Sequence, residues 1–234
     1  MPRESAATQG SGILFGEGDD DVAFLKGLLE HLGIRGIRVE PYIFTKPRRG
    51  GGQKALTGKD ALTATLKALP MTQGFGRVNR IGVIRDLDED PLVDVMTSIR
   101  NALQGNPPKS DRPPAPTHPG EIAEEGRFRV GVFLFPGDGR TGCLEDLCLD
   151  AIRTDPAWPC INSYFECLDR SGLIRPSLGT MKSKARFHAW LASRERANFG
   201  SLAVAAEAGA IPWDHAAFDP LKTFLRTLFA QPAP

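Results

Sequence analysis

Residues 12–29 read GILFGEGDDDVAFLKGLL, in which a short apolar run is followed at once by acidic residues. The run Ile13–Phe15 is typical of a buried strand, and Val22–Leu32 carries apolar residues at the spacing of a helix. Glu17 comes just after the expected strand, and Asp19–Asp21 open the expected helix. The stretch therefore predicts a strand–helix unit in which the carboxyl end of the strand is strongly acidic.

The composition is that of an ordinary globular protein. With 234 residues, of which 41% are hydrophobic, the chain is long enough to bury one sizeable core. Because the formal net charge is only +1, any contact with nucleic acid has to rely on a local basic patch. No apolar run approaches the roughly 18–20 residues of a membrane span, and the first residues lack a signal-peptide core. We therefore expect a cytoplasmic protein without membrane contact.

The rest of the chain alternates between strand and helix patterns. The expected strands are Ile13–Phe15, Ile37–Phe44, Arg80–Ile84 and Arg129–Phe135. The expected helices are Val22–Leu32, Lys59–Leu69, Pro91–Leu103, 142–152, Ile161–Leu168, Lys182–Arg196 and Leu221–Phe229. This alternation predicts an α/β fold with a mostly parallel sheet of about four strands, flanked by helices. Residues 1–152 are the predicted α/β core, and 153–234 are a predicted helical C-terminal extension packed on it. The proline-rich stretch Asn106–Gly120 is expected to be a surface excursion.

A second acidic stretch follows a later strand, where residues 80–91 read RIGVIRDLDEDP. Asp86 and Asp88 come directly after the apolar run of that strand, as Glu17 does after the first one. Since the carboxyl ends of parallel strands meet at one edge of a sheet, these carboxylates should lie close together. Like charges so placed repel one another unless a cation neutralises them or some stay protonated. Oxygen ligands suit Mg²⁺ or Mn²⁺, and no softer ligand is evident at these strand ends.

Some of these acids have simpler interpretations. Asp19 or Asp20 is expected to cap the first helix, because carboxylates bind free backbone N–H groups at helix starts. Glu89 and Asp90 precede another helix and are interpreted as solvated first-turn acids. Arg85 offers an alternative to a metal: if it pairs with Asp88, its guanidinium neutralises the site and a two-ion mechanism fails.

The ordered set Glu17-Gly18 and then Asp86-Leu87-Asp88 resembles the TOPRIM domain, which topoisomerases, bacterial primases, a ribosomal-RNA maturase and OLD-type nucleases share. The resemblance covers about residues 12–152. Within the TOPRIM proteins, the chain is most similar to the OLD-type nucleases and to small uncharacterised TOPRIM-like proteins. A weaker extension reaches residue 192. In that comparison, further positions match Asp21, Glu145 in an acidic helix, and Lys184 in a late helix.

The resemblance implies a metal-dependent phosphodiester hydrolase that acts on DNA or RNA, with a role in mobile-element or phage-defence biology. The implied metal ligands, for Mg or Mn, are Glu17, Asp21, Asp86, Asp88 and Glu145. The implied catalytic residues are Glu17, Asp86, Asp88 and Lys184. Lys184 would offset the charge that develops on the scissile phosphate.

A second function class stays open, namely a non-catalytic or regulatory TOPRIM-like module. Such a module would work with a separate partner, such as an ATPase, or as a homo-oligomer. The chain has no Walker motif, so any ATP dependence would have to come from that partner. Cleavage of plasmid by the purified chain with Mg²⁺ or Mn²⁺ separates the two classes.

Two remaining features bear on ligands. Residues 46–54 read KPRRGGGQK, so that Lys46, Arg48, Arg49 and Lys54 can meet nucleic-acid phosphates, although a flexible solvated loop explains the stretch equally well. The chain has four cysteines and no C-x-x-C pair. These cysteines are Cys143, Cys148, Cys160 and Cys167. We interpret all four as free thiols rather than zinc ligands or disulfides.

Overall fold

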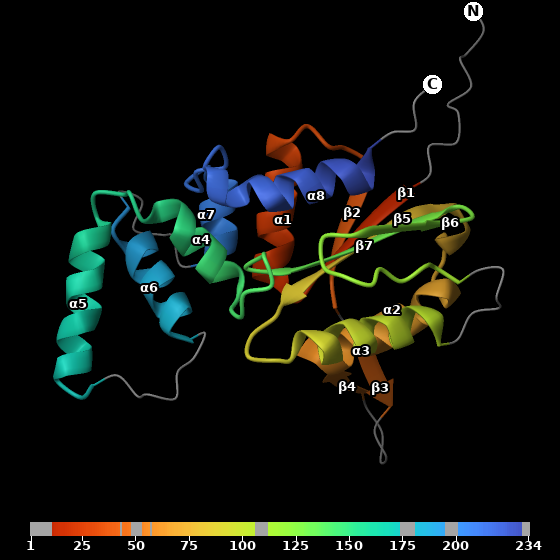
Figure 1. Ribbon diagram of the computed structural model, residues 1–234, viewed down its shortest axis with the longest axis horizontal. Coiled ribbons are helices and arrows are strands. Elements are labelled where there is room, and N and C mark those ends of the chain that lie inside the picture. The colour runs from red at the N-terminus through yellow and green to blue at the C-terminus, as the bar shows by residue number, and fades with distance from the viewer. Residues whose placement is uncertain are drawn as a thin grey trace, which may run out of the picture.

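A computed structural model describes residues 11–42, 44–47, 53–56, 58–105, 112–173, 181–194 and 201–230 of the chain. Its centre is a five-stranded sheet with the order β2-β1-β5-β7-β6 (Figure 1). The strands are β1 (Ser11–Gly16), β2 (Ile37–Pro41), β5 (Val78–Asp86), β6 (Ile122–Glu125) and β7 (Phe128–Phe135). The first four in this order are parallel, and β6 is antiparallel to β7. The predicted α/β fold with a mostly parallel sheet is therefore confirmed.

Helices cover both faces of the sheet (Figure 1). The helices of the described chain are α1 (Asp19–His31), α2 (Gly58–Ala68), α3 (Leu92–Gln104), α4 (Leu144–Ile152), α5 (Trp158–Arg170), α6 (Met181–Ala192), α7 (Leu202–Glu207) and α8 (Asp219–Phe229). Short 3-10 turns span Leu69–Met71, Phe75–Arg77 and Ala216–Phe218. Within the described ranges, none of the helices combines the length and the apolar character that crossing a bilayer would take.

Alternate residues of each parallel strand enter different halves of the core. Leu14 of β1 and Ile84 of β5 pack with α1 and α4–α8, whereas Ile13 and Val83 pack with α2 and α3. The side chains of a strand point to its two faces in turn, so a strand buried on both faces must be apolar throughout. This requirement explains why the continuous apolar runs in the sequence predicted the parallel strands.

The C-terminal helix α8 lies directly on the sheet. Gly82 of β5 and Gly131 of β7 are partners across the two strands. A Cβ atom at Gly131 would come within 2.7 Å of the Phe224 ring, and one at Gly82 would come within 3.0 Å of Leu228. The two glycines therefore let α8 approach the sheet, and the helices after residue 152 share one hydrophobic core with α1.

Three local predictions differ from the structure. The expected strand Ile37–Phe44 ends at Pro41. The two ends of the expected loop Lys46–Lys54 belong to the paired strands β3 (Phe44–Pro47) and β4 (Gln53–Leu56) of a hairpin. These strands were not predicted because their residues do not alternate between apolar and polar. The short polar strand β6 was not predicted, because edge strands of this kind carry little apolar signal.

The topology makes the carboxyl ends of β1 and β5 a natural binding position. From β1 the chain passes through α1 to β2, which lies next to β1 at one edge of the sheet. From β5 it passes through α3 and β6 to β7, which lies next to β5 in the opposite direction of the strand order. Because α1 and α3 cover opposite faces, the neighbouring carboxyl ends of β1 and β5 form a topological switch point, where folds of this kind bind ligands. Glu17 follows β1 and Asp86 ends β5, so both lie at this switch point.

Candidate metal centre

Asp86 is the best-defined residue at the switch point. It is 8% exposed and lies on the same face of β5 as Ile84, while Arg85 points to the opposite face. The Leu144 backbone N–H at the start of α4 donates a hydrogen bond to Asp86 Oδ1 over 2.9 Å. This bond connects the end of β5 to the N-terminus of α4.

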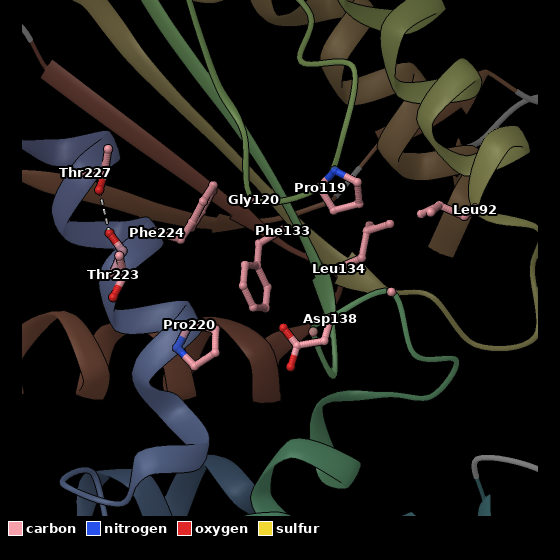
Figure 2. Close-up of a pocket in the computed structure, with 12 residues that line it drawn as sticks. Leu92, Pro119, Gly120, Phe133, Leu134, Asp138, Pro220, Thr223, Phe224 and Thr227 are labelled. Carbon is pink, nitrogen blue, oxygen red and sulfur yellow. Dashed lines mark hydrogen bonds between the residues drawn. The ribbon is translucent and has the colours of Figure 1, made fainter.

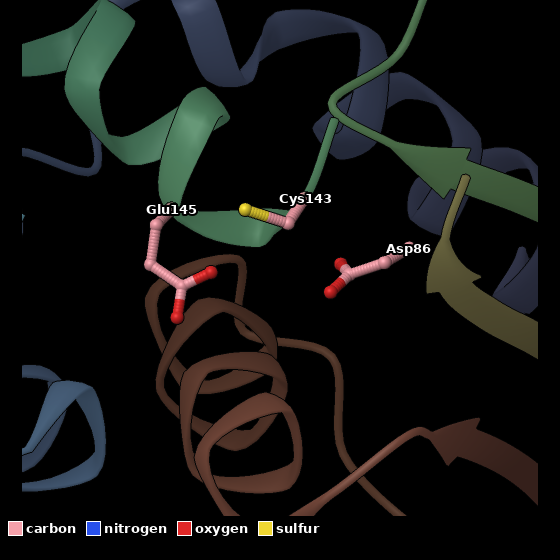
Figure 3. A group of neighbouring side chains, drawn as sticks. All are labelled: Asp86, Cys143 and Glu145. Carbon is pink, nitrogen blue, oxygen red and sulfur yellow. The ribbon is translucent and has the colours of Figure 1, made fainter. Parts of the chain in front are cut away.

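The start of α4 brings two further groups to Asp86. Cys143 is the N-cap residue of α4, and the Asp146 carboxylate accepts its backbone N–H over 2.9 Å. One ligand atom each of Asp86, Cys143 and Glu145 lies within 4.8 Å of the other two (Figure 3). The sulfur and the two carboxylates therefore face a common space.

A backbone bridge fixes the segment that precedes α4. Asp88 and Gly142 exchange two backbone hydrogen bonds of 2.8 and 3.1 Å. Asp88 has a left-handed backbone with φ of 53°, a conformation that Asp adopts more readily than most residues. The bridge thus joins the turn after β5 to the turn before α4, next to Asp86.

The start of α1 contributes Asp21 rather than the expected caps Asp19 or Asp20. Gly18 is the N-cap residue, and its N–H donates to Asp21 Oδ2 over 3.1 Å. Asp20 instead accepts the Ala203 N–H of α7 over 3.1 Å. A carboxylate at the third helical position can reach back to the N-cap amide, which explains why Asp21 binds the Gly18 N–H and the expected caps do not. Asp21 Oδ1 is buried and has no hydrogen-bond partner within the described part of the chain.

Four carboxylates from three segments act on one another at this site; we call Glu17, Asp21, Asp86 and Glu145 the acidic group. Burial, then Glu17, and to a smaller extent Glu145 raise the pKa of Asp21 to about 7. Burial, then Asp21, and also the rest of the group raise the pKa of Asp86 to about 8. Without a cation, these two carboxyls therefore tend to hold protons at neutral pH.

The raised pKa values predict how the stability of the metal-free chain depends on pH. Asp21 and Asp86 have ordinary pKa values of 3.8, and their pKa values in the folded chain are about 7 and about 8. Between these limits the folded chain keeps protons that the unfolded chain has lost, so the free energy of unfolding should fall as the pH rises from about 4 to about 8, by on the order of a few kcal/mol. Urea unfolding in the presence of a chelator measures this dependence.

Asp86→Asn is the matched control for that measurement. Asn keeps an oxygen that can accept the Leu144 N–H but has no proton to lose. We expect a weaker pH dependence and a more stable protein at pH 8 than the metal-free wild type. Equal slopes for the two proteins would show that Asp86 does not carry a raised pKa.

Lys184 reaches the same site from α6. It is half-buried, and although burial by itself lowers its pKa, Glu145, Asp86 and other nearby acids outweigh that effect and raise it. Lys182, two residues away, lies 3.9 Å from Asp169 of α5 instead. The two lysines therefore have different surroundings, as their spacing on a helix predicts.

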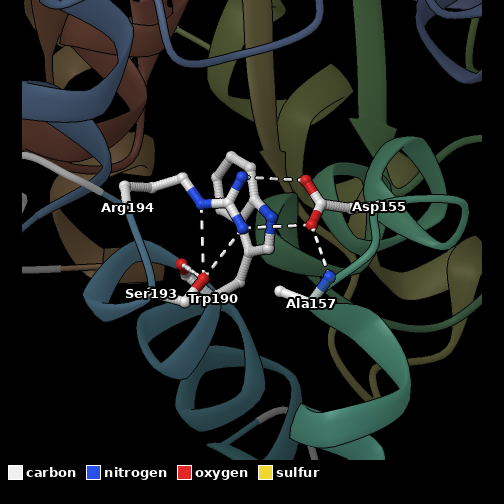
Figure 4. Close-up of polar contacts among 5 residues, drawn as sticks. All are labelled: Asp155, Ala157, Trp190, Ser193 and Arg194. Atoms are coloured by element: carbon white, nitrogen blue, oxygen red, sulfur yellow. Dashed lines mark hydrogen bonds and ion pairs between the residues drawn. The ribbon is translucent and has the colours of Figure 1, made fainter.

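Contacts at the carboxyl end of α6 hold this helix to the segment after α4. Arg194 donates two hydrogen bonds of 2.9 and 3.0 Å to the Asp155 carboxylate, which also accepts the Ala157 N–H (Figure 4). The Arg194 guanidinium stacks on the Trp190 ring at 4.7 Å. At the other end of α6, the Ser183 hydroxyl donates to Asp146 of α4. These contacts set the position from which Lys184 faces the acidic group.

Arg85 does not neutralise Asp88 in the described structure. Its guanidinium lies 3.1 Å from Asp90, and its Nε donates to the backbone oxygen of Asp86. Asp90 was interpreted as a solvated acid, but it is a partner of this buried arginine. The expected pair of Arg85 with Asp88 is therefore replaced by a pair of Arg85 with Asp90.

The structure brings most of the predicted site residues together, with one difference in grouping. The expected first set was Glu17, Asp86 and Asp88, but the tight group among the described residues combines Asp86 with Cys143 and Glu145. The bond from Leu144 holds the Asp86 carboxylate at α4, which explains the difference. Asp88 remains coupled to the site through Lys184.

Two of the predicted nucleic-acid contacts, Lys46 and Lys54, lie in the β3–β4 hairpin. Lys46 and Lys54 are paired across its two strands. Arg48 and Arg49 fall outside the described residues. The role of this basic segment stays a prediction.

Sequence reasoning missed two residues of the site. Cys143 was interpreted only as a free thiol; it is indeed free, but it faces the carboxylates of Asp86 and Glu145. Tyr42 is buried, donates its hydroxyl hydrogen to the Ile84 carbonyl, and has a pKa raised by burial and then by Asp21. The sequence placed Cys143 inside the expected helix 142–152, where nothing marked it as a partner of the carboxylates. Nothing in the sequence distinguished Tyr42 from a core aromatic.

A separate cavity of about 440 Å³ lies between α8 and the turn after β7 (Figure 2). Its walls include Phe133 and Phe224, and Asp138 is the charged side chain among the described residues that line it. An apolar cavity with an acid and no cation is poorly suited to a phosphate group. The acidic group is therefore the better candidate site for chemistry on an anionic substrate.

The fold and the site define an α/β protein with a partly buried acidic centre at the switch point of a mostly parallel sheet. The chain belongs to the family described as a protein of unknown function (DUF3226), whose model matches residues 11–230. Comparison with curated proteins and with solved structures gave no match.

Proposed function

We propose that this protein is a metal-dependent phosphodiester hydrolase that cleaves nucleic acid. The observation that carries the proposal is the gathering of four carboxylates, from the turn after β1 and from α1, β5 and α4, at one edge of the sheet, where burial and mutual repulsion raise the pKa values of Asp21 and Asp86. Several buried carboxylates are unfavourable together unless a cation balances them. The arrangement is therefore better explained by a bound divalent ion than by a structural role.

The residues present suit Mg²⁺ or Mn²⁺. The acidic group and Asp88 supply oxygen ligands, and Asp21 Oδ1 is a buried oxygen without a hydrogen-bond partner within the described residues. Asp86 and Glu145, whose oxygens face one space, would hold one ion, and Glu17, Asp21 and Asp88 would supply oxygen ligands for a second. The chemistry that such ions supply is activation of water and stabilisation of negative charge on phosphate oxygens.

The presence of Lys184 at the site favours an anionic substrate over a role in metal storage alone. A protonated lysine cannot be a metal ligand, because it has no free lone pair. Its ammonium group lies within electrostatic reach of Glu145 and Asp86, where it can stabilise the charge that develops on a phosphate during cleavage. We assign the substrate to nucleic acid because Lys46 and Lys54 are partners in the register of a hairpin, and the sequence between them contains Arg48 and Arg49.

Cleavage by the purified full-length chain tests the proposal. Supercoiled plasmid and labelled single- and double-stranded DNA and RNA are incubated with Mg²⁺ or Mn²⁺, and with a chelator as the control. We expect metal-dependent cleavage of at least one substrate and none with the chelator. If no substrate is cleaved, with or without a partner ATPase, the protein is instead a non-catalytic module of the kind the sequence left open.

A further inference from the structure

Cys143 gives the acidic centre a ligand of a different kind. Its side chain is fully buried, and its Sγ lies within 4.8 Å of carboxylate oxygens of both Asp86 and Glu145. Figure 3 shows the sulfur directed toward the side of Glu145, with the Asp86 carboxylate reaching toward the same space from β5. The position is set by the backbone, because Cys143 is the N-cap residue of α4 and its N–H is held by Asp146.

A second observation shows that this space suits a cation. Asp21 Oδ1 is buried without a hydrogen-bond partner in the described ranges, although Oδ2 of the same carboxylate accepts the Gly18 N–H. The charge of Asp21 acts on Asp86, so this unpartnered oxygen lies close enough to the group of Asp86, Cys143 and Glu145 to interact with its charge. Buried carboxylate oxygens normally have a hydrogen-bond donor or a cation as partner.

The mixed donor set discriminates between ions. Mg²⁺ prefers oxygen ligands alone, whereas Zn²⁺, Co²⁺ and Cd²⁺ accept carboxylate oxygen and thiolate sulfur together. Two oxygen ligands and one sulfur ligand around one space therefore favour Zn²⁺, Co²⁺ or Cd²⁺ over Mg²⁺. Cys148, the other buried cysteine of this region, packs in the hydrophobic core and has no place in the group of Asp86 and Glu145.

We propose that Cys143, Asp86 and Glu145 form a binding site for a thiophilic divalent ion of the Zn²⁺ class, which competes with Mg²⁺ for the two carboxylates. The thiol hydrogen now points to Asp146 Oδ2, 3.2 Å from the sulfur. On binding, the thiol releases this proton to solvent and the sulfur coordinates the ion as a thiolate. Asp146 keeps the hydrogen bonds from the Cys143 N–H and the Ser183 hydroxyl.

The inference rests on the metal centre of the proposed function but does not depend on cleavage of nucleic acid. It predicts that Zn²⁺ displaces Mg²⁺ or Mn²⁺ from the site at lower concentration than an all-oxygen site would allow. Zn²⁺ would then act as an inhibitor of any activity that needs Mg²⁺.

Cobalt absorption spectroscopy tests the site directly. Co²⁺ is added to the full-length metal-free chain, and we expect a thiolate-to-cobalt charge-transfer band in the near ultraviolet. The band should be absent in Cys143→Ser and unchanged in Cys148→Ser. Serine is a good N-cap residue, so α4 should keep its start. Zn²⁺ affinity should fall at least about tenfold in Cys143→Ser, with Mn²⁺ affinity little changed, because even the loss of an outer contact to a metal ligand typically costs about 10–100-fold.

The possible outcomes separate this inference from the proposed function. A wild-type protein that binds Co²⁺ without the charge-transfer band, or a Cys143→Ser protein that keeps the band, overturns the role of Cys143. Failure to bind either Co²⁺ or Mn²⁺ overturns the metal centre and this inference with it. A protein that shows the band but cleaves no nucleic acid supports the thiophilic site and overturns only the proposed activity.

Discussion

Mn²⁺ binding and metal-dependent cleavage should both be lost in the Asp86→Asn variant. Asp86 is buried, lies in the tight group with Glu145 and Cys143, and is coupled to Asp21. Asn retains an oxygen for the Leu144 N–H, so the substitution removes the charge and leaves the connection to α4. We expect affinity and rate to fall by at least about 10²-fold, more than the loss of an outer contact to a metal ligand. Isothermal titration calorimetry with Mn²⁺ and plasmid nicking measure the two quantities.

The control for this substitution is Asp94→Asn. Asp94 is an exposed acid in the first turn of α3, so the variant changes the net charge by the same amount away from the acidic group. It should bind Mn²⁺ and cleave like the wild type. If Asp86→Asn is folded and still binds Mn²⁺ with wild-type affinity, the acidic group is not the metal site.

Lys184→Ala should reduce the cleavage rate by about 10²–10³-fold, which is the usual effect of losing one preorganised electrostatic donor. Mn²⁺ affinity should not fall with the rate, because the Lys184 ammonium is close to the same carboxylates that attract the metal and repels the metal ion. We therefore expect Mn²⁺ affinity to stay the same or to increase. Single-turnover cleavage at saturating Mn²⁺ and calorimetry separate the two effects.

Lys182→Ala is the internal control on the same helix. Lys182 faces Asp169 of α5, and its substitution removes the same charge without changing the acidic group. Its cleavage rate should be close to that of the wild type. Equal losses in the two variants would mean that α6 contributes only general positive charge, and Lys184 would then have no specific role.

Part of the fold could be predicted because a parallel sheet imposes its requirement directly on the sequence. Strands buried on both faces need continuous apolar runs, and Ile81–Ile84 and Val130–Phe135 have them. Elements with one exposed side or edge carry a weaker signal. The β3–β4 hairpin and β6 are short and polar, and their pairing depends on neighbouring strands rather than on their own residues.

The helix caps show the same limit on a smaller scale. The acidic run Asp19–Asp21 correctly indicated a helix start, because carboxylates favour the positive end of a helix. Which of the three binds the N-cap amide depends on backbone geometry, and Asp21 does so. Asp20 instead contacts Ala203, which is distant in sequence and reaches Asp20 only when α7 packs on α1.

The sequence alone determined that Glu17 and Asp86 would meet at one edge of the sheet. The reason is local: each follows an apolar run, and the carboxyl ends of adjacent parallel strands lie side by side. Only the tertiary structure decided which other groups join them. Cys143 reaches Asp86 through the contact between α4 and the end of β5, and Lys184 through the packing of α6 on α4. Such contacts join segments far apart in the chain, and they depend on how helices pack rather than on any pattern within one segment.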